Sequence, residues 1–181
     1  MEINKTTLQD VWLIKPDIFE DFRGHYVMTY HEKLYKIGSY LISPLIEHDI
    51  STTRHKGTIR GIHYSPHDWK LYEIFRGAVY YVIVNCEEGH PEFGKWEAFT
   101  LSDQNHYQIL KHPRYGAGFL TLTDDVVLHY LQSQYYNKDD PDQKTFKWDD
   151  PLFNIFWPRI TPHPILSRRD EEGKYGFGSE K

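Results

Sequence analysis

Thr58-Ile59-Arg60-Gly61-Ile62-His63-Tyr64 is a short run rich in β-branched and aromatic residues, with a glycine at its centre. Similar runs recur on both sides, and turn residues such as Arg76-Gly77 and His112-Pro113 separate them. Many short runs at this spacing are typical of an antiparallel sandwich or barrel, so we predict an all-β fold. The expected strands cover residues 11–14, 26–30, 45–53, 58–64, 71–75, 78–86, 96–101, 107–110, 119–123 and 126–134.

Length and charge limit the organisation of the chain and its partners. A chain of 181 residues can build one sizeable core, so we expect a single domain over residues 1–181 with a loose tail at about 174–181. The formal charge of −5 argues against a nucleic-acid or membrane partner, which usually requires a clustered basic surface. Helices are expected only as short peripheral pieces, at residues 31–37 and in a turn that begins at Ser167.

The single cysteine, Cys86, lies in an apolar run and excludes a disulfide within the chain. A reducing compartment is the default for such a composition. The first residues carry no apolar signal core, and no stretch reaches the apolar length that spans a bilayer. We therefore expect a cytoplasmic protein.

Four residues suit the removal of a proton beside a carbonyl group. His63 is a candidate base, Tyr130 a candidate acid, Lys70 a cation for developing negative charge, and Asp170 a carboxylate that could orient the histidine. Strict alternation would place Arg60 and His63 on opposite faces of their strand. Both can line one cavity only if the strand is bulged near its glycine.

Each of these residues also has a purely structural interpretation. His63 could be a hydrogen-bonded strand residue and Arg60 a solvated charge, while Lys70 could be an exposed residue at a strand start. Tyr130 alternates with Leu128 and could be core. Ser167-x-x-Asp170 resembles a helix start, so helix capping alone could explain Asp170.

Eleven histidines raise the question of a metal site. His63 and His67 are the nearest useful pair, but the sequence shows no His-x-His motif and no obvious third ligand beside them. It also lacks a phosphate loop, a dinucleotide fingerprint and a Gly-x-Ser-x-Gly motif. We predict neither a metal ion nor a cofactor.

Several sequence blocks together resemble the dTDP-4-dehydrorhamnose 3,5-epimerases over nearly the whole chain. That resemblance implies a cupin-like jelly-roll β-barrel, a homodimer and a nucleotide-linked 4-keto sugar as substrate. The matching blocks are residues 21–24, 59–64, 70–71, 91–96, 101–102, 148–151, 157–158 and 166–170.

The resemblance also implies roles for individual catalytic residues. His63 falls on the family's base and Asp170 on the aspartate that pairs with it. Tyr130 falls on the presumed acid, and Lys70 on the lysine that stabilises the enolate.

The implied substrate-binding residues lie at three further positions. Arg60 and Arg23 match positions that contact the diphosphate, and Arg23 lies in a polar turn that could carry a bidentate arginine to phosphate. Tyr136 matches a second tyrosine near the nucleotide sugar.

Three departures from the family pattern affect the expected substrate. Ala117 stands where a histidine is usual and Met28 where a glutamate is usual, and Glu47-His48-Asp49-Ile50-Ser51 replaces a Gln-x-Asn-x-Ser stretch. The chain is also similar to epimerases of GDP-linked 4-keto-6-deoxy-heptoses, at His48-Asp49 and at residues 140–143. We therefore add His48 and Asp49 to the candidate substrate-binding residues and favour a GDP-linked heptose over a dTDP-linked hexose, for surface polysaccharide synthesis.

Other classes of protein share this type of barrel. A metal-dependent cupin or a sugar ketoisomerase would carry paired histidines, but Ser65 occupies the position two residues after His63. A non-catalytic carbohydrate-binding barrel could use Tyr130 only for stacking on sugar. Whether carbon 3 alone or both carbons 3 and 5 are inverted is left open, because the same residues could serve both steps.

Overall fold

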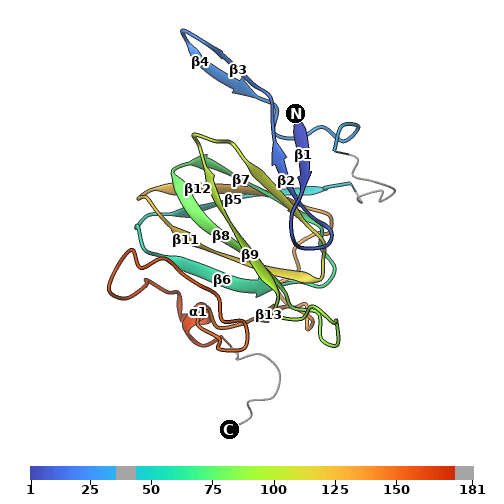
Figure 1. Ribbon diagram of the computed structural model, residues 1–181, viewed down its shortest axis with the longest axis vertical. Helices are drawn as coiled ribbons and strands as arrows, with labels where there is room; N and C mark the ends of the chain where they lie inside the picture. The colour runs from blue at the N-terminus through green and yellow to red at the C-terminus, as the bar shows by residue number, and fades with distance from the viewer. Residues whose placement is uncertain (36–43, 174–181) are drawn as a thin grey trace.

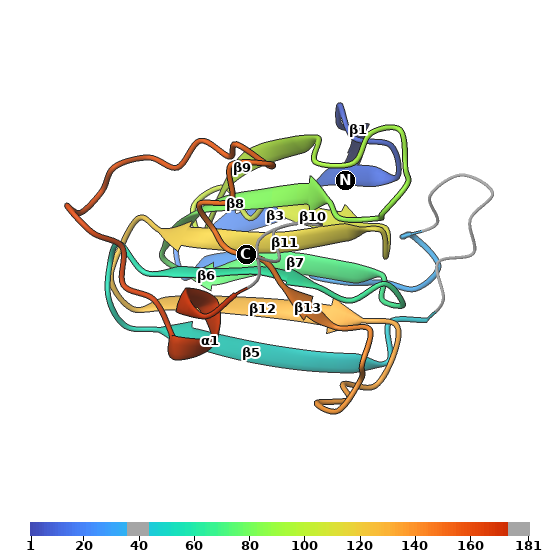
Figure 2. The same cartoon turned by 90° about the horizontal axis from the view of Figure 1, so that it is seen from below.

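Two antiparallel sheets face each other and enclose the interior of a flattened barrel (Figure 1). A computed structural model describes residues 1–35 and 44–173 of the chain. The six-stranded sheet has the order β1-β2-β10-β7-β12-β5, and the five-stranded sheet has the order β13-β6-β11-β8-β9. Helix α1 lies against β6 of the five-stranded sheet, as Figure 1 and the view from below in Figure 2 show.

The elements have the following bounds: β1 Glu2–Lys5, β2 Val11–Lys15, β3 Ile18–Asp21, β4 Gly24–Val27, β5 Glu47–Thr53, β6 Ile59–Tyr64, β7 Lys70–Arg76, β8 Ala78–Asn85, β9 Trp96–Ser102, β10 Gln108–Lys111, β11 Tyr115–Thr121, β12 Val126–Gln132, β13 Lys144–Thr145 and α1 Arg168–Glu171.

Alternation along the strands fills the space between the sheets with apolar side chains. Ile74 of β7, Ile83 of β8 and Val126 of β12 are almost fully buried in a cluster that draws on both sheets. Burial of such a side chain contributes about 1.5–3 kcal/mol to stability. The outer faces carry separate clusters, around Leu71 on the six-stranded sheet and around Val82 on the five-stranded sheet.

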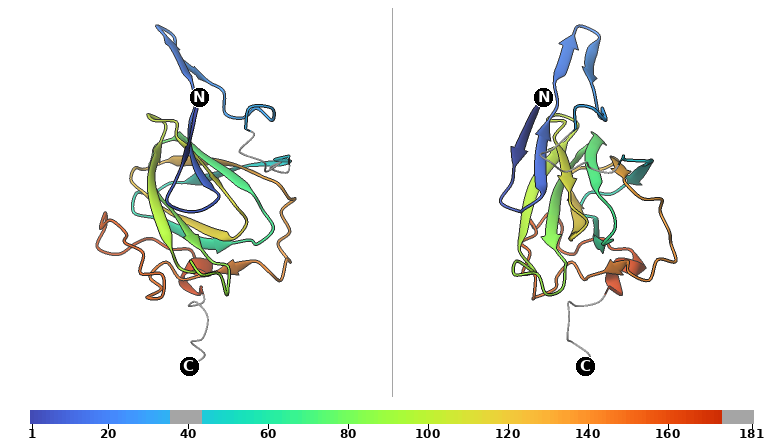
Figure 3. Two further views of the ribbon diagram at one scale, coloured as in Figure 1. Left: turned by 45° about the vertical axis from the view of Figure 1, so that its right-hand side comes forward. Right: turned by 90° about the vertical axis from the view of Figure 1, so that its right-hand side faces the viewer.

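A hairpin formed by β3 and β4 projects away from the barrel (Figure 3). Its large side chains do not pack into a core: Phe22 is 98% exposed and Phe19 is 64% exposed. These aromatic side chains therefore contact solvent and not the barrel.

The all-β prediction is confirmed, with specific differences in the extent of the strands. The strand expected at 26–30 overlaps β4 only at residues 26–27, and the strand expected at 119–123 begins earlier, at Tyr115. Glycines 116 and 118 concealed that start, because glycine is normally depleted in strands. Strands β1, β3 and β13 were not predicted.

The helix predicted at residues 31–37 is wrong where the structure describes it, because residues 31–35 contain only a turn; residues 36 and 37 lie outside the described residues. The predicted turn after Ser167 is confirmed as α1, with the Ser167 side chain accepting from the Asp170 backbone N–H. The tail at 174–181 also lies outside the described residues, and the single domain remains a prediction. Among the described residues, no helix is long and apolar enough to cross a membrane.

Candidate active site

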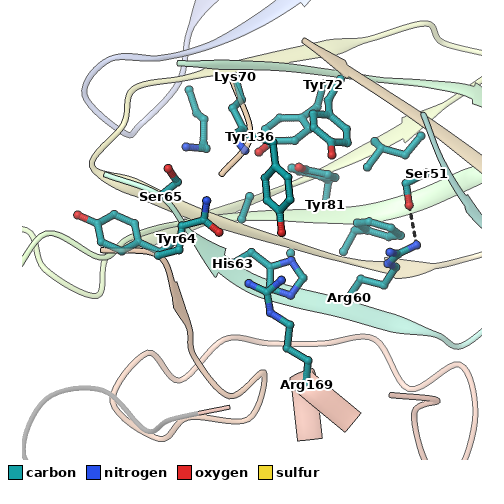
Figure 4. A pocket seen from close by; sticks show the side chains of 17 residues that line it. Ser51, Arg60, His63, Tyr64, Ser65, Lys70, Tyr72, Tyr81, Tyr136 and Arg169 are labelled. Carbon is teal, nitrogen blue, oxygen red and sulfur yellow. Dashed lines mark hydrogen bonds between the residues drawn. The ribbon is translucent and has the colours of Figure 1, made fainter. Parts of the chain in front are cut away.

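A cavity of about 300 Å³ opens between the two sheets and contains most of the predicted site residues (Figure 4). His63 and Arg60 reach it from β6, whereas Lys70 and Tyr130 reach it from β7 and β12 of the opposite sheet. Figure 4 shows His63 and Lys70 approaching the cavity from opposite sides. A flat substrate between the sheets would therefore meet the histidine on one face and the tyrosine on the other.

The predicted bulge at Gly61 is present and brings both Arg60 and His63 to the cavity. Pairing of β6 with β11 changes register between Ala117 and Phe119, so strict alternation is broken there. Gly61 has φ of +113°, and a Cβ at this position would lie 2.6 Å from the Ala117 carbonyl oxygen. Only glycine fits this close approach without displacement of the neighbouring backbone.

His63 and Asp170 form a hydrogen-bonded pair at the wall of the cavity. The His63 Nε2 atom lies 2.6 Å from Asp170 Oδ1, although the two residues are far apart in the sequence. Burial alone would raise the pKa of Asp170, but the hydrogen bond and charge interaction with His63, together with bonds from Ser167 and the Gly61 backbone, lower it below its ordinary value. The ionised carboxylate can therefore orient the imidazole and stabilise its positive charge after proton uptake.

Asp170 also has the capping role that was the alternative interpretation. The Ser167 hydroxyl donates to Asp170 Oδ2 at 2.9 Å and accepts from the Asp170 backbone N–H at 3.2 Å. The two roles are compatible, because each oxygen of the carboxylate has its own partner. The cap holds the carboxylate in place for His63.

Tyr130 stands on the opposite sheet with its proton firmly held. Its pKa is raised to about 12, first by burial and then by the negative charges of Asp49 and Glu47. Asp49 is the direct register partner of Tyr130 on β5. A phenol that stays protonated across the physiological range can donate to a strongly basic carbanion or enolate carbon.

Lys70 supplies positive charge in the same region. Its ammonium lies 5.6 Å from the centroid of the Tyr130 ring and 3.9 Å from Asp68 Oδ2. Burial lowers the pKa of Lys70, while Asp68 and Asp49 act in the opposite direction. A buried ammonium beside an open cavity favours an anionic partner in that cavity.

Arg60 and Tyr136 also line the cavity, as predicted. The Arg60 guanidinium donates to Ser51 Oγ at 2.5 Å. Ser51, Lys111 and Arg169 line the cavity as well, although they were not among the residues predicted from the sequence. Arg169 could have been noticed as the neighbour of Asp170, but Lys111 lies in a short strand with no chemical motif.

The structure does not bring Arg23 or His48 to this cavity within one chain. Arg23 lies at the tip of the projecting hairpin, where its guanidinium donates to Asp21 at 2.6 Å. His48 alternates with Asp49 on β5, and its ring lies 5.9 Å from that of His129, which points to the outer side of the sheet. Asp49 is on the inner side, where one of its carboxylate oxygens is buried without a hydrogen-bond partner.

A possible cation-binding group lies elsewhere, on the surface. Ligand atoms of His67, Asp140 and Asp142 lie within 4.8 Å of one another. Sequence spacing did not predict this grouping, because about 70 residues separate the histidine from the aspartates. His63 does not belong to it, and exposed acidic groups of this kind are common without a metal ion.

Comparison with known proteins connects this geometry to a family. The family model described as dTDP-4-dehydrorhamnose 3,5-epimerase matches residues 5–175. The chain belongs to this family. The resemblance that the sequence blocks indicated is therefore confirmed.

Individual members of the dTDP-4-dehydrorhamnose 3,5-epimerase family agree with this assignment. The chain is 31% identical over 94% of its length to a dTDP-4-dehydrorhamnose 3,5-epimerase of Sinorhizobium fredii, covering 87% of that protein. It is 35% identical over its full length to a protein of the same name from Neisseria gonorrhoeae, of which it spans 54%. The structure of dTDP-6-deoxy-D-glucose-3,5-epimerase from Legionella pneumophila in complex with dTDP-4-keto-L-rhamnose superposes with a TM-score of 0.88 at 27% identity, covering 96% of this chain and 92% of that chain.

The cupin-like barrel expected from the sequence resemblance is thus also confirmed. The preference for a GDP-linked heptose gains no support, because these relatives are named for dTDP-linked sugars.

Proposed function

We propose that the protein is an epimerase that inverts carbon 3, carbon 5 or both in a dTDP-linked 4-keto-6-deoxy hexose. One observation carries the proposal: a His63–Asp170 pair faces Tyr130 and Lys70 across a single cavity. Base and acid therefore stand on opposite sheets, as inversion of a carbon centre requires. Membership of the dTDP-4-dehydrorhamnose 3,5-epimerase family supports the substrate class.

The proposed reaction is a pair of proton transfers. The ketone at carbon 4 acidifies the hydrogens on carbons 3 and 5, because the electrons of either broken C–H bond can move onto the ketone oxygen. His63 takes the proton, and the resulting enolate oxygen is held by Lys70. A preorganised donor of this kind stabilises the transition state by about 3–4 kcal/mol.

Tyr130 completes the inversion by delivering its proton to the same carbon from the opposite face. The ketone is restored as the enolate electrons return to form the new C–H bond. His63 then releases its proton to water and Tyr130 regains one, so the enzyme returns to its starting state. No oxidant, metal ion or cofactor is needed for this balance.

The nucleotide end of the substrate needs cationic partners at the mouth of the cavity. Arg60 and Arg169 line the cavity and can pair with phosphate oxygens, since a guanidinium suits such oxygens bidentately. Tyr136 offers an aromatic face for a base or a sugar. A GDP-linked heptose, the alternative suggested by residues 47–51, is tested in the same assay.

We further propose that the active form is a homodimer in which the projecting hairpin of one chain completes the cavity of its partner. The hairpin carries Arg23 and the fully exposed Phe22 at its tip, away from its own cavity. A phosphate contact by Arg23 is compatible with that position only if a second chain supplies the cavity. Analytical sedimentation of the protein tests whether it is a dimer. Measurement of dTDP affinity in an Arg23→Ala variant, which should bind dTDP more weakly, tests whether the hairpin completes the cavity of the partner.

The central experiment measures deuterium uptake from heavy water into dTDP- and GDP-linked 4-keto-6-deoxy sugars by mass spectrometry. The wild-type protein is expected to incorporate one deuteron for each carbon that exchanges, so the count also decides between carbon 3 and both carbons. His63→Asn should abolish the uptake, whereas His67→Asn, a surface histidine outside the cavity, should retain it. Uptake at the wild-type rate in His63→Asn would contradict the proposal.

Replacement of the acid separates exchange from inversion. Tyr130→Phe keeps the base and the lysine, so exchange at one face should persist while the inverted product fails to form. Chromatographic analysis of the product alongside deuterium uptake distinguishes these outcomes. Equal loss of both activities would show that Tyr130 has a different role.

A further inference from the structure

Lys111 is a fully buried lysine in the wall of the cavity. It is 1% exposed, lies at the end of β10 and lines the same cavity as His63 and Tyr130. Lysine is rarely buried unless it has a charged partner. None of the steps proposed above uses this residue.

The strand register places Lys111 directly opposite Lys70. The two residues are antiparallel partners in β10 and β7, and both side chains line the cavity. Directly opposed side chains on one face of a sheet have Cβ atoms about 4.5–5.5 Å apart, and like charges in that arrangement are destabilising. A pair of lysines here therefore needs nearby negative charge.

Asp68 supplies only part of that charge. Its Oδ2 atom accepts from the Ser65 hydroxyl at 2.6 Å and lies 3.9 Å from the Lys70 ammonium. Lys111 reaches only the Asp68 backbone carbonyl, at 3.4 Å, and this is its one hydrogen bond within the part of the chain that the structure describes. An ammonium has three donors. The Lys70 and Lys111 side chains thus share the single carboxylate of Asp68, and N–H donors of Lys111 remain without a hydrogen-bond acceptor among the described residues.

Burial and the facing charges oppose the protonated form of Lys111. Its pKa is lowered to about 7, first by burial and then by the Lys70 ammonium, while Asp68 and Cys86 act in the opposite direction. An anion in the cavity beside both lysines would offset the repulsion between them. The arrangement is therefore one that an anionic ligand group stabilises.

We propose that Lys111 and Lys70 together form a two-ammonium site that holds the enolate oxygen of the 4-keto sugar. The inference rests on the proposed epimerase function and deepens it: Lys111 becomes a second catalytic cation, in contact with the reacting group. The site favours substrates that develop negative charge at this end of the cavity.

The test compares Lys111→Met and Lys111→Arg with the wild-type protein on the substrate that the wild-type protein epimerises. Lys111→Met keeps the length and volume of the side chain without charge, and kcat should fall by roughly 100-fold, the lower end of the cost of losing one oxyanion donor, because Lys70 remains in place. The affinity for dTDP alone should be unchanged, because the proposed two-ammonium site contacts the sugar and not the nucleotide. Deuterium uptake should slow in proportion to kcat.

A pH profile provides a readout that a purely structural role would not affect. In the wild-type protein, kcat/KM should fall as pH rises through about 7, because free Lys111 loses its proton there. That limb should vanish in Lys111→Met and move to higher pH in Lys111→Arg, because arginine stays charged. A limb that is identical in all three proteins overturns the proposal.

A second pair of variants separates loss of catalysis from loss of folding. Lys111→Met could fail to fold because the negative charge of Asp68 loses a nearby positive charge. In that case the Asp68→Asn protein, which lacks this carboxylate charge, is compared with the Asp68→Asn/Lys111→Met double variant. Wild-type kcat in the folded Lys111→Met protein, or no difference between the two proteins in the Asp68→Asn background, refutes the role of Lys111. Lack of deuterium uptake by the wild-type protein on every 4-keto sugar refutes the epimerase function instead, so the two failures are distinguishable.

Discussion

Replacement of Asp170 by asparagine removes one negative charge and leaves the shape of the side chain almost unchanged. The carboxylate lies 2.6 Å from His63 Nε2 and also accepts from the Ser167 hydroxyl. Asparagine can keep the contact with Ser167 and the backbone cap, so the fold around α1 should persist. What is lost is the charge that stabilises the imidazolium of His63 once it has taken the proton.

The size of the effect follows from that single interaction. A hydrogen bond to a charged group contributes about 1.5–3 kcal/mol. Because about 1.4 kcal/mol corresponds to a tenfold change in rate, kcat should fall by roughly 10- to 150-fold in Asp170→Asn. The effect should appear in kcat rather than in KM, since the charge matters mainly after proton transfer has begun.

The assay follows deuterium uptake and product formation under saturating substrate, with circular dichroism and thermal unfolding as checks of the fold. Asp142→Asn is the matched control, because Asp142 lies 3.1 Å from His67 in an exposed His–Asp pair outside the cavity. That variant should keep the wild-type kcat. An Asp170→Asn protein that is folded and retains the wild-type kcat would refute the role of the carboxylate, as would an equal loss in the control.

Two further predictions concern stability. Gly61→Ala should lower the free energy of unfolding by about 1–3 kcal/mol because of backbone strain at positive φ, and by a comparable further amount because the new Cβ would contact the Ala117 carbonyl. Gly24→Ala is the control, since Gly24 has positive φ but open space around it, and this variant should lose only the strain contribution. Chemical denaturation compares the two variants, and equal losses of stability would contradict the contact argument. The lowered pKa of Asp170, with its bond to His63 a main cause, should make part of the stability depend on pH: this part is fully present above the unfolded-state pKa of about 3.9 and is lost as pH falls through the lower folded-state pKa. Denaturation of the wild-type and Asp170→Asn proteins across that range should show their stability difference shrinking toward low pH, and a constant difference would refute the linkage.

Much of the barrel could be predicted from the sequence, because each strand carries its own signal. Alternation in β12 correctly placed Tyr130 on the same face as Leu128, and the glycine in β6 correctly indicated a bulge. The early half of β11 was missed, because its glycines carry no such signal. The helix at residues 31–37 failed where the structure describes it, since a short run of helix-compatible residues without a buried face does not form a helix by itself.

The candidate site divides in the same way. Motif blocks in the sequence identified His63, Lys70, Tyr130 and Asp170, all of which the fold brings to one cavity or its wall, whereas Lys111 belonged to no motif. The position of Lys111 depends on the register between β10 and β7, which the sequence does not specify.

By itself, the amino-acid sequence determined the all-β class, the epimerase family and the types of chemical group that are available. The fold class and the chemical groups follow from periodicity and residue identity, both of which are local, whereas the family followed from the resemblance of several sequence blocks to known epimerases. Only the tertiary structure decided that His63 meets Asp170 after an interval of 107 residues, that Tyr130 faces them from the other sheet, and that Arg23 lies away from its own cavity. Such relations depend on strand order and register, which result from the packing of strands that are distant in the sequence.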